Sequence, residues 1–248
     1  MLDLKNLSGG YSGSNIVQDV SLCFPEGKIT VIIGQNGCGK STLLKLACGQ
    51  LAKRAGELLL DKQSLAALSR QEIAQKISYL PQARTMPDIT VEALVLHGRF
   101  PWLGYPRVYT VKDRKLAESA MERAGIISHR KKLFAKLSGG EQQKAYLAML
   151  LAQDTKTVLL DEPTTYLDIE HQLELIELLS ALKSDGRAIA AVLHDLNLAL
   201  SCADQLAVMQ AGSLLAVGTP RNILDLGILE QAFGIKVRLE QSYSFERL

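Results

Sequence analysis

Short apolar runs separated by turn residues open the chain. Apolar and polar positions alternate over the first 33 residues, with breaks at Gly9 and Gly10 and at residues 25–27, a pattern typical of short strands joined by turns. Residues 29–33 are almost continuously apolar, and they lead into a glycine-rich turn and a helical pattern over residues 40–46. The pattern predicts a small sheet, followed by a strand, a loop and a helix.

Two later runs are wholly apolar, at residues 158–160 and 188–193, with a helical pattern between them. Strands of this kind, without polar alternation, are expected in a parallel sheet that is buried on both faces. Residues 83–153 have no strand pattern and show helical periodicity instead. After Gly218 we expect a closing helix and strand.

These patterns predict one α/β domain over residues 1–248. Its core is expected to combine residues 1–82 with residues 154–248, and residues 83–153 are expected to form a helical insertion.

Composition and charge narrow the class of protein. Apolar residues make up 47% of the chain and charged residues 22%, so a chain of 248 residues is expected to fold throughout. The net charge is +2 and the basic residues are scattered, which argues against a nucleic-acid partner. The four cysteines have no CxxC spacing and are predicted to be reduced thiols.

No apolar stretch approaches the roughly 20 residues that a bilayer crossing needs. Residues 1–5 also lack the basic and apolar regions of a secretory signal. We therefore expect a cytoplasmic protein that reaches a membrane only through a partner.

The strongest chemical signal is a phosphate-binding loop. It comprises Gly34, Gln35, Asn36, Gly37, Cys38, Gly39, Lys40, Ser41 and Thr42. Glycines at this spacing let backbone N–H groups converge on phosphates, and the following helix directs its positive end toward them. Lys40 is predicted to reach the terminal phosphates and Ser41 to bind Mg²⁺.

A second signal is the pair of acids that ends the apolar run at 158–160. Functional groups in a parallel sheet gather at the carboxyl ends of the strands, which is where Asp161 and Glu162 are expected. Asp161 is predicted to hold Mg²⁺ through water, and Glu162 to polarise the water that attacks the γ-phosphate. In isolation, two acids at a strand end are also compatible with a solvated cap.

A third element, Ser138, Gly139 and Gly140, stands immediately before an amphipathic helical pattern. Alone it reads as a helix cap. Together with the phosphate loop, Tyr11, Gln82 and His194, it makes nearly the whole chain resemble the ATP-binding cassette (ABC) family, the nucleotide-binding subunits of ABC transporters. The resemblance implies the P-loop ABC ATPase fold, with an N-terminal antiparallel β subdomain and a helical signature subdomain.

The resemblance also implies roles for individual residues. Tyr11 matches the aromatic residue that stacks on adenine, a contact worth about 1 to 3 kcal/mol. Gln82 matches the glutamine that contacts Mg²⁺ and water, and His194 matches the switch histidine at the γ-phosphate. Tyr166 to Asp168 match the loop that couples the two halves of a dimer.

In this family the signature residues 138–140 contact the nucleotide of the other subunit. The resemblance therefore implies a homodimer with two ATP molecules between its subunits, whose closing and opening drive separate membrane permease subunits. It implies an ATPase on the inner face of the cell membrane, served indirectly by a substrate-binding protein.

Three segments resemble the branch that imports ferric siderophores, haem and cobalamin. They are residues 90–101, 161–172 and 194–197. An amphipathic helix with a polar face is the alternative interpretation of the first of them. The sequence does not specify which of these substrates is carried.

The chain departs from the common family pattern at two places. Glu141 and Gln142 stand where Gln and Arg are more usual, and Cys38 occupies a loop position that usually holds a small residue without a thiol. Neither change removes a phosphate-binding group. Cys38 predicts sensitivity to thiol reagents.

Other readings remain open at this point. Another importer branch carrying a different small solute would show the same motifs. A chromosome-maintenance or DNA-repair ATPase would separate the phosphate loop from the signature by a long coiled coil, whereas roughly a hundred residues without heptads separate them here. A translation factor would carry two cassettes. A non-hydrolysing module is disfavoured by the presence of Lys40, Asp161, Glu162 and His194 together.

Overall fold

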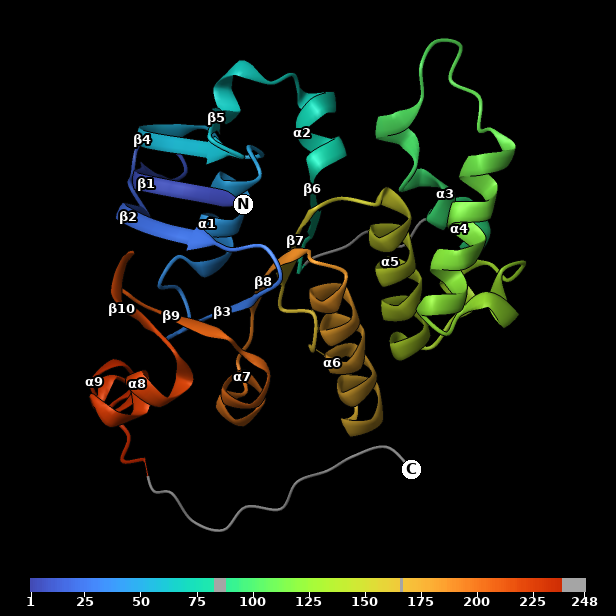
Figure 1. Cartoon of the computed structure of the whole chain (residues 1–248). Coiled ribbons are helices and arrows are strands. Elements are labelled where there is room, and N and C mark those ends of the chain that lie inside the picture. Colours follow the sequence, from blue (N-terminus) through green and yellow to red (C-terminus); the bar gives the residue numbers. More distant parts are fainter. Residues whose placement is uncertain (83–87, 166, 238–248) are drawn as a thin grey trace.

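The computed structural model describes residues 1–82, 88–165 and 167–237 (Figure 1). The strands are β1 (Leu2–Gly9), β2 (Val17–Phe24), β3 (Ile29–Gly34), β4 (Lys53–Leu60), β5 (Gln63–Ser64), β6 (Ile77–Leu80), β7 (Thr157–Asp161), β8 (Ala188–Val192), β9 (Gln205–Gln210) and β10 (Ser213–Gly218). The α-helices are α1 (Lys40–Ala47), α2 (Arg70–Lys76), α3 (Val91–His97), α4 (Val111–Arg123), α5 (Gly139–Gln153), α6 (Ile169–Ser184), α7 (Leu196–Cys202), α8 (Pro220–Asp225) and α9 (Ile228–Phe233). Short 3₁₀ turns are η1 (Leu65–Ala67), η2 (Phe100–Trp102), η3 (Ile127–His129) and η4 (Phe134–Lys136).

Two sheets enclose α1. The strand order is β2-β1-β4-β5 in the antiparallel sheet and β10-β9-β3-β8-β7-β6 in the larger sheet. Within the larger sheet β9, β3, β8, β7 and β6 run parallel, and only β10 pairs antiparallel with its neighbour. Leu43, Leu44 and Leu46 of α1 are fully buried between the sheets, which fixes the helix that follows the phosphate loop.

The helices α3, α4 and α5 form a separate helical part beside the larger sheet (Figure 1). Its interior is apolar and includes Met121, Phe134 and Tyr146, of which the two aromatic rings meet edge to face with centroids 5.0 Å apart. The same buried cluster continues into the large sheet through Val158 and Leu160 of β7. The helical part is therefore packed continuously onto the sheet that carries the acids.

The apolar pattern predicted some strands and missed others. The buried strands β3, β7 and β8 lie where apolar runs predicted them. The analysis did not predict β4, because charged residues and a glycine interrupt its first half, nor β5, β6, β9 and β10. After Gly218 the described residues contain α8 and α9 but no strand, and residues 238–248 lie outside the described residues, so the closing strand stays a prediction.

Among the described residues, no helix has both the length and the apolar character that a bilayer crossing requires. Cys23, Cys38, Cys48 and Cys202 are all free thiols.

One buried ion pair connects the helices of the helical part. Arg99, which follows α3, donates from Nε to Asp113 Oδ1 of α4 at 3.0 Å and from a terminal nitrogen to the Ala152 carbonyl of α5 at 2.8 Å. Both side chains are almost completely buried. Asp113 also accepts from the backbone N–H of Thr110, which caps α4.

Replacing Asp113 by Ala is expected to destabilise the protein by about 3 to 5 kcal/mol, because it leaves the Arg99 charge buried without its counter-ion. Urea unfolding measures the change. The control is Glu118→Ala, which removes an exposed partner of Arg130 and is expected to cost at most about 1 kcal/mol. Equal losses in the two variants would contradict a special role for the buried pair.

Candidate nucleotide-binding site

The loop between β3 and α1 is shaped by two glycines. A Cβ atom on Gly34 would lie 2.3 Å from the Met209 carbonyl oxygen of β9, so only glycine lets the strand end this close to its neighbour. Gly39 has a φ of +103° and caps α1, a backbone conformation that other residues adopt with strain. The loop consequently opens a cavity of about 560 Å³ above the start of α1.

This cavity brings together residues from distant parts of the chain. It is lined by Asn36, Gly37, Gly39, Lys40, Ser41, Thr42, Gln82, Glu162 and His194, and also by Ile16 and Thr165, which the sequence analysis did not identify. Ile16 precedes β2, and Thr165 follows β7 within the segment 161–172, but no role in the site was predicted for either residue. Only their place in the fold identifies them.

Lys40 lies almost buried at the start of α1. Its Nζ donates to the carbonyl oxygens of Gly34 at 2.7 Å and Gln35 at 3.0 Å. A buried ammonium is costly unless it is hydrogen-bonded, and a phosphate would replace neutral acceptors with an anionic one. Lys40 is therefore held in the loop with its charge available to an anion.

Two residues of the predicted phosphate loop, Gln35 and Cys38, do not line the cavity. Gln35 donates from its side chain to the Ala232 carbonyl of α9 at 2.9 Å, which ties the loop to the C-terminal helices. Cys38 is buried, and its Sγ lies 4.0 Å from Lys40 Nζ. A thiol reagent must therefore open the loop before it reaches Cys38.

Asp161 ends β7 and is held by two hydroxyl groups. Ser41 donates to its Oδ1 at 2.8 Å, and Tyr79 donates to its Oδ2 at 3.0 Å. Burial raises the pKa of Asp161, and the charge of Glu162 adds to this, while the two hydroxyl bonds oppose it. Burial followed by the charge of Asp161 raises the pKa of Tyr79, which keeps its hydroxyl a donor.

Glu162 is the centre of a second network. Its Oε2 accepts from Gln82 Nε2 at 2.6 Å and from the Thr165 hydroxyl at 3.3 Å, and its Oε1 lies 2.6 Å from His194 Nε2. Its backbone has a φ of +52°, in the left-handed region that non-glycine residues rarely adopt. This strained backbone, together with the three partners, aims one carboxylate into the cavity.

The donor set suits a nucleoside triphosphate with a hard divalent cation. Backbone N–H groups at a helix start and the buried Lys40 provide an anion cradle. Ser41 and Asp161 together offer hydroxyl and carboxylate oxygens beside it, the ligands that Mg²⁺ prefers, since it takes one or two carboxylates along with substrate phosphates.

Tyr11 lies outside this cavity lining, in the turn between β1 and β2. Its ring is partly exposed, with Lys45 Nζ 5.7 Å from the ring centroid and 3.2 Å from the hydroxyl. An exposed ring beside α1 is free to meet a planar base.

The signature residues Ser138, Gly139 and Gly140 lie away from the phosphate cavity, at the start of α5. Glu141, the residue that departs from the common pattern, completes a capping box: its Oε2 accepts from Ser138 N at 2.7 Å, and Ser138 Oγ accepts from Glu141 N at 3.3 Å. His129 Nε2 lies 2.9 Å from Glu141 Oε1. The acid at position 141 therefore fixes the backbone of Ser138, which explains why it is tolerated.

His171 links the signature to the start of α6, a contact that the sequence analysis missed. Its Nδ1 lies 2.6 Å from Asp168 Oδ1, and Asp168 caps α6 by accepting from His171 N. A Cβ atom on Gly140 would lie 2.9 Å from His171 Nε2, so the ring packs directly against this glycine. The only sequence signal was a histidine three residues after the capping acid. Tyr166, which was also predicted to belong to this loop, falls outside the described residues.

Because of this contact, we expect the effect of Gly140→Ala on stability to depend on whether His171 is present. Gly140→Ala normally stabilises a helix by about 1 kcal/mol, but here the added methyl displaces the His171 ring and breaks its bond to Asp168. We expect no gain, or a loss, in the free energy of unfolding. In a His171→Ala background the methyl has room, and the same change is expected to stabilise. Identical effects in both backgrounds, measured by urea unfolding, would show that ring and glycine are independent.

Residues 17–165 match the ABC transporter family. The chain is 39% identical over 241 residues to the iron(3+)-hydroxamate import ATP-binding protein FhuC of Bacillus subtilis (strain 168), which covers 96% of this chain and 89% of the relative. It is also 39% identical over 234 residues to the ferric enterobactin transport ATP-binding protein FepC of Escherichia coli (strain K12), covering 94% of this chain and 86% of the relative. Among solved structures, the dimeric structure of MJ0796, a bacterial ABC transporter cassette, matches with a TM-score of 0.79 at 26% identity, covering 89% of this chain and 99% of the other. These matches confirm the predicted ABC ATPase fold, and the chain belongs to the ABC transporter family.

Proposed function

We propose that this chain binds ATP with Mg²⁺ and hydrolyses it as the ATP-binding subunit of an importer of iron complexes. The observation that supports this most strongly is Glu162, a carboxylate bonded to both Gln82 and His194 beside the phosphate loop. The printed functions of the two relatives, iron(3+)-hydroxamate import and ferric enterobactin transport, support the class of cargo.

The phosphate loop would bind the β- and γ-phosphates through its backbone N–H groups and Lys40. Ser41 and Asp161 would hold Mg²⁺, with Gln82 contributing its side-chain oxygen. The cation supplies charge neutralisation at the phosphates when bound. Tyr11 would stack on the adenine ring.

Glu162 is suited to accept a proton from the attacking water, because its carboxylate faces the cavity and is oriented by its partners. His194, which follows β8, would leave Glu162 and donate a hydrogen bond to the γ-phosphate. Gln82 would respond to the same change, since it shares the Glu162 carboxylate.

We further infer a homodimer. Ser138, Gly139, Gly140 and Asp168 lie outside the phosphate cavity of their own chain, so they are available to the nucleotide of a second copy. ATP would favour the closed pair, and hydrolysis would remove that preference. The opening and closing would drive a membrane permease on the inner face of the membrane, with a substrate-binding protein delivering the cargo.

The first test is Glu162→Gln. It removes the proton acceptor and keeps the shape, so hydrolysis is expected to fall about 10²- to 10⁴-fold while ATP still binds. With ATP and Mg²⁺ the variant should elute as a dimer, and without nucleotide as a monomer. The matched control is Glu170→Gln, the same change at an exposed position on α6. If Glu162→Gln hydrolyses ATP at the wild-type rate, Glu162 is not the group that accepts the proton from the attacking water.

The cargo is tested by uptake into cells whose only copy carries Glu162→Gln, beside cells with Glu170→Gln. Uptake of labelled ferric siderophore is expected to be lost only in the first, because unhydrolysed ATP holds the pair closed. Labelled haem and cobalamin are measured in parallel. Loss of haem uptake alone, or of cobalamin uptake alone, would identify that compound as the cargo instead of a siderophore. Normal uptake of all three compounds with hydrolysis abolished would reject the proposal that this chain energises their import.

A further inference from the structure

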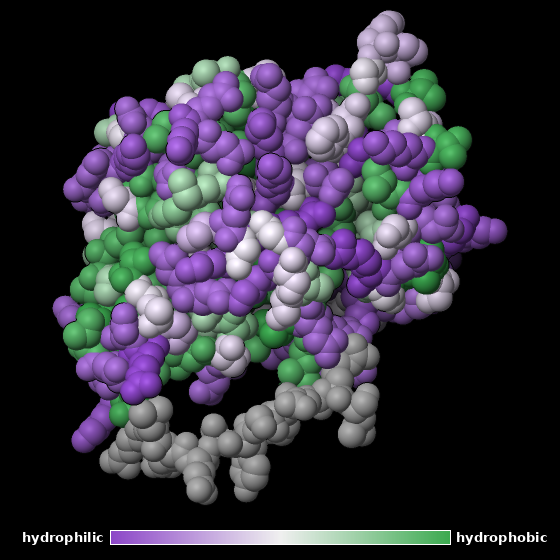
Figure 2. Space-filling view, viewed as in Figure 1, coloured by the Kyte–Doolittle hydropathy of each residue, from purple (hydrophilic) through white to green (hydrophobic). Residues whose placement is uncertain are grey.

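An exposed apolar and basic surface lies between α3 and α4. We call residues 100–115 the tip. Five large apolar side chains of the tip face solvent: Tyr105 is fully exposed, Val111 is 72% exposed and Val108 is 66% exposed, while Phe100 and Trp102 are each about two-fifths exposed. Figure 2 shows hydrophobic side chains interleaved with hydrophilic ones at this edge of the molecule. Contiguous exposure of this kind marks interaction surfaces in soluble domains.

The tip carries a charge of a single sign. Arg107, Lys112, Arg114 and Lys115 are exposed. The one acid within residues 100–115, Asp113, is buried and paired with Arg99. The Arg107 guanidinium lies 4.4 Å from the Phe100 ring centroid, so cation and aromatic ring form one surface.

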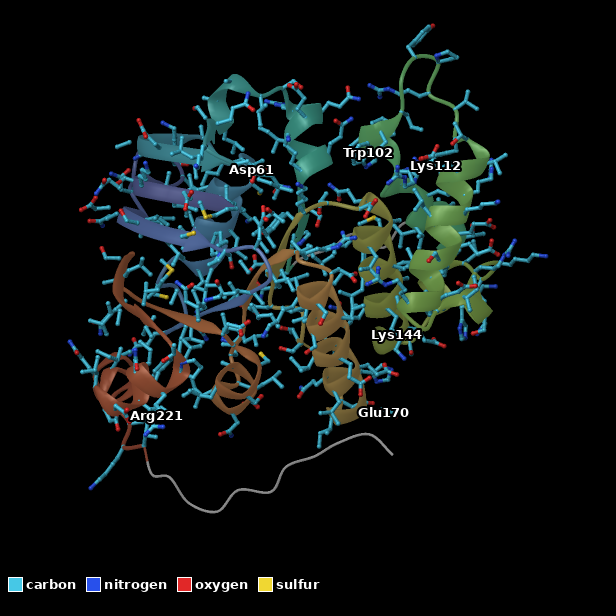
Figure 3. The ribbon with its side chains drawn as sticks, viewed as in Figure 1. Asp61, Trp102, Lys112, Lys144, Glu170 and Arg221 are labelled. Atoms are coloured by element: carbon cyan, nitrogen blue, oxygen red, sulfur yellow. The ribbon has the colours of Figure 1, made fainter. Side chains whose placement is uncertain are left out.

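The tip is rigidly joined to the part of the core that carries α2. Gln71 and Gln75 of α2 both donate to the Pro101 carbonyl, at 2.9 and 2.8 Å, and Trp102 Nε1 donates to the Gln153 carbonyl at 2.8 Å. A groove of about 420 Å³ lies beside α2, between the end of α1 and β6, and its lining includes Ile73, Ile77 and Gln153. The tip and α2 lie on the same side of the molecule, at the top of the view, and the tip extends farther outward than α2 (Figures 1 and 3). A helix of the permease in the proposed function would bind this groove, which would direct the tip toward the membrane.

We propose that the tip contacts anionic lipid headgroups of the membrane that holds the permease. Aromatic side chains favour the headgroup level, and basic residues near an anionic leaflet are attracted to it. The permease itself fits this surface less well, because cytoplasmic loops of membrane proteins carry an excess of Lys and Arg that would repel four exposed cations.

The orientation of the tip rests on the proposed function, but the binding itself is measured without ATP or permease. The purified full-length chain is sedimented with protein-free vesicles of phosphatidylcholine alone, or of an equal mixture of phosphatidylcholine and phosphatidylglycerol, at low ionic strength. We expect binding to the anionic vesicles only, weakening with added salt. Lys112→Glu with Lys115→Glu should weaken binding roughly tenfold or more.

The matched control is Lys28→Glu with Arg221→Glu, which makes the same change in net charge at exposed positions away from the tip. It should retain binding. Tyr105→Ser with Val108→Ser, which leaves charge unchanged, should weaken binding. Equal loss in the two charge variants would mean attraction by net charge alone and would overturn the proposal, as would absence of binding to protein-free anionic vesicles, which leaves a protein partner as the occupant.

ATP hydrolysis in vesicle-free solution is measured for every variant and is expected to match wild type, because the tip lies outside the phosphate cavity. If the wild-type chain hydrolyses ATP but does not bind anionic vesicles, only the proposed lipid contact is rejected. Intact vesicle binding without hydrolysis would reject only the ATPase function.

Discussion

The parallel pairing of β3, β8 and β7 is the constraint on which the site depends. Three neighbouring strands that run in one direction end at one edge of the sheet, and the residues that follow them meet there. In this way the loop after Gly34, the acid Glu162 and His194 come together although up to 160 residues separate them, as between Gly34 and His194. If one of these strands were shifted by one residue relative to its neighbour, its side chains would point to the opposite face of the sheet.

The close packing at this edge also explains the unusual backbone there. Gly34 approaches β9 so closely that no side chain fits, and Glu162 adopts a left-handed conformation. Such conformations persist only where the surroundings hold them. Here the buried α1 on one side and the hydrogen bonds of Glu162 on the other supply that support. At this edge of the sheet, the left-handed backbone therefore lies directly beneath a carboxylate that lines the phosphate cavity.

In the proposed homodimer, the start of α5 would contribute to the nucleotide site of the second copy, away from the phosphate cavity of its own chain. The start of α5 is fixed by the Ser138 and Glu141 capping box, and it touches the start of α6 through His171. A movement of α5 relative to the sheet would therefore displace His171 and with it the Asp168 carboxylate that it contacts. The apolar cluster that buries α1 also includes Ile77, with Ile73 packed against it, and both residues line the groove beside α2. A change at the phosphate loop would therefore reach this groove through packed side chains.

The sequence by itself determined the phosphate loop, the two acids at the end of β7 and the buried strands β3, β7 and β8, because these depend on local spacing and continuous apolar runs. Strand β4 was not predicted, because charged residues and a glycine interrupt its first half and leave too short an apolar run at its end. Only the tertiary structure decided that Tyr79 holds Asp161, that Ile16 lines the cavity and that His171 packs on Gly140. These contacts join residues far apart along the chain or depend on the exact approach of two backbones, and neither is encoded by neighbouring residues.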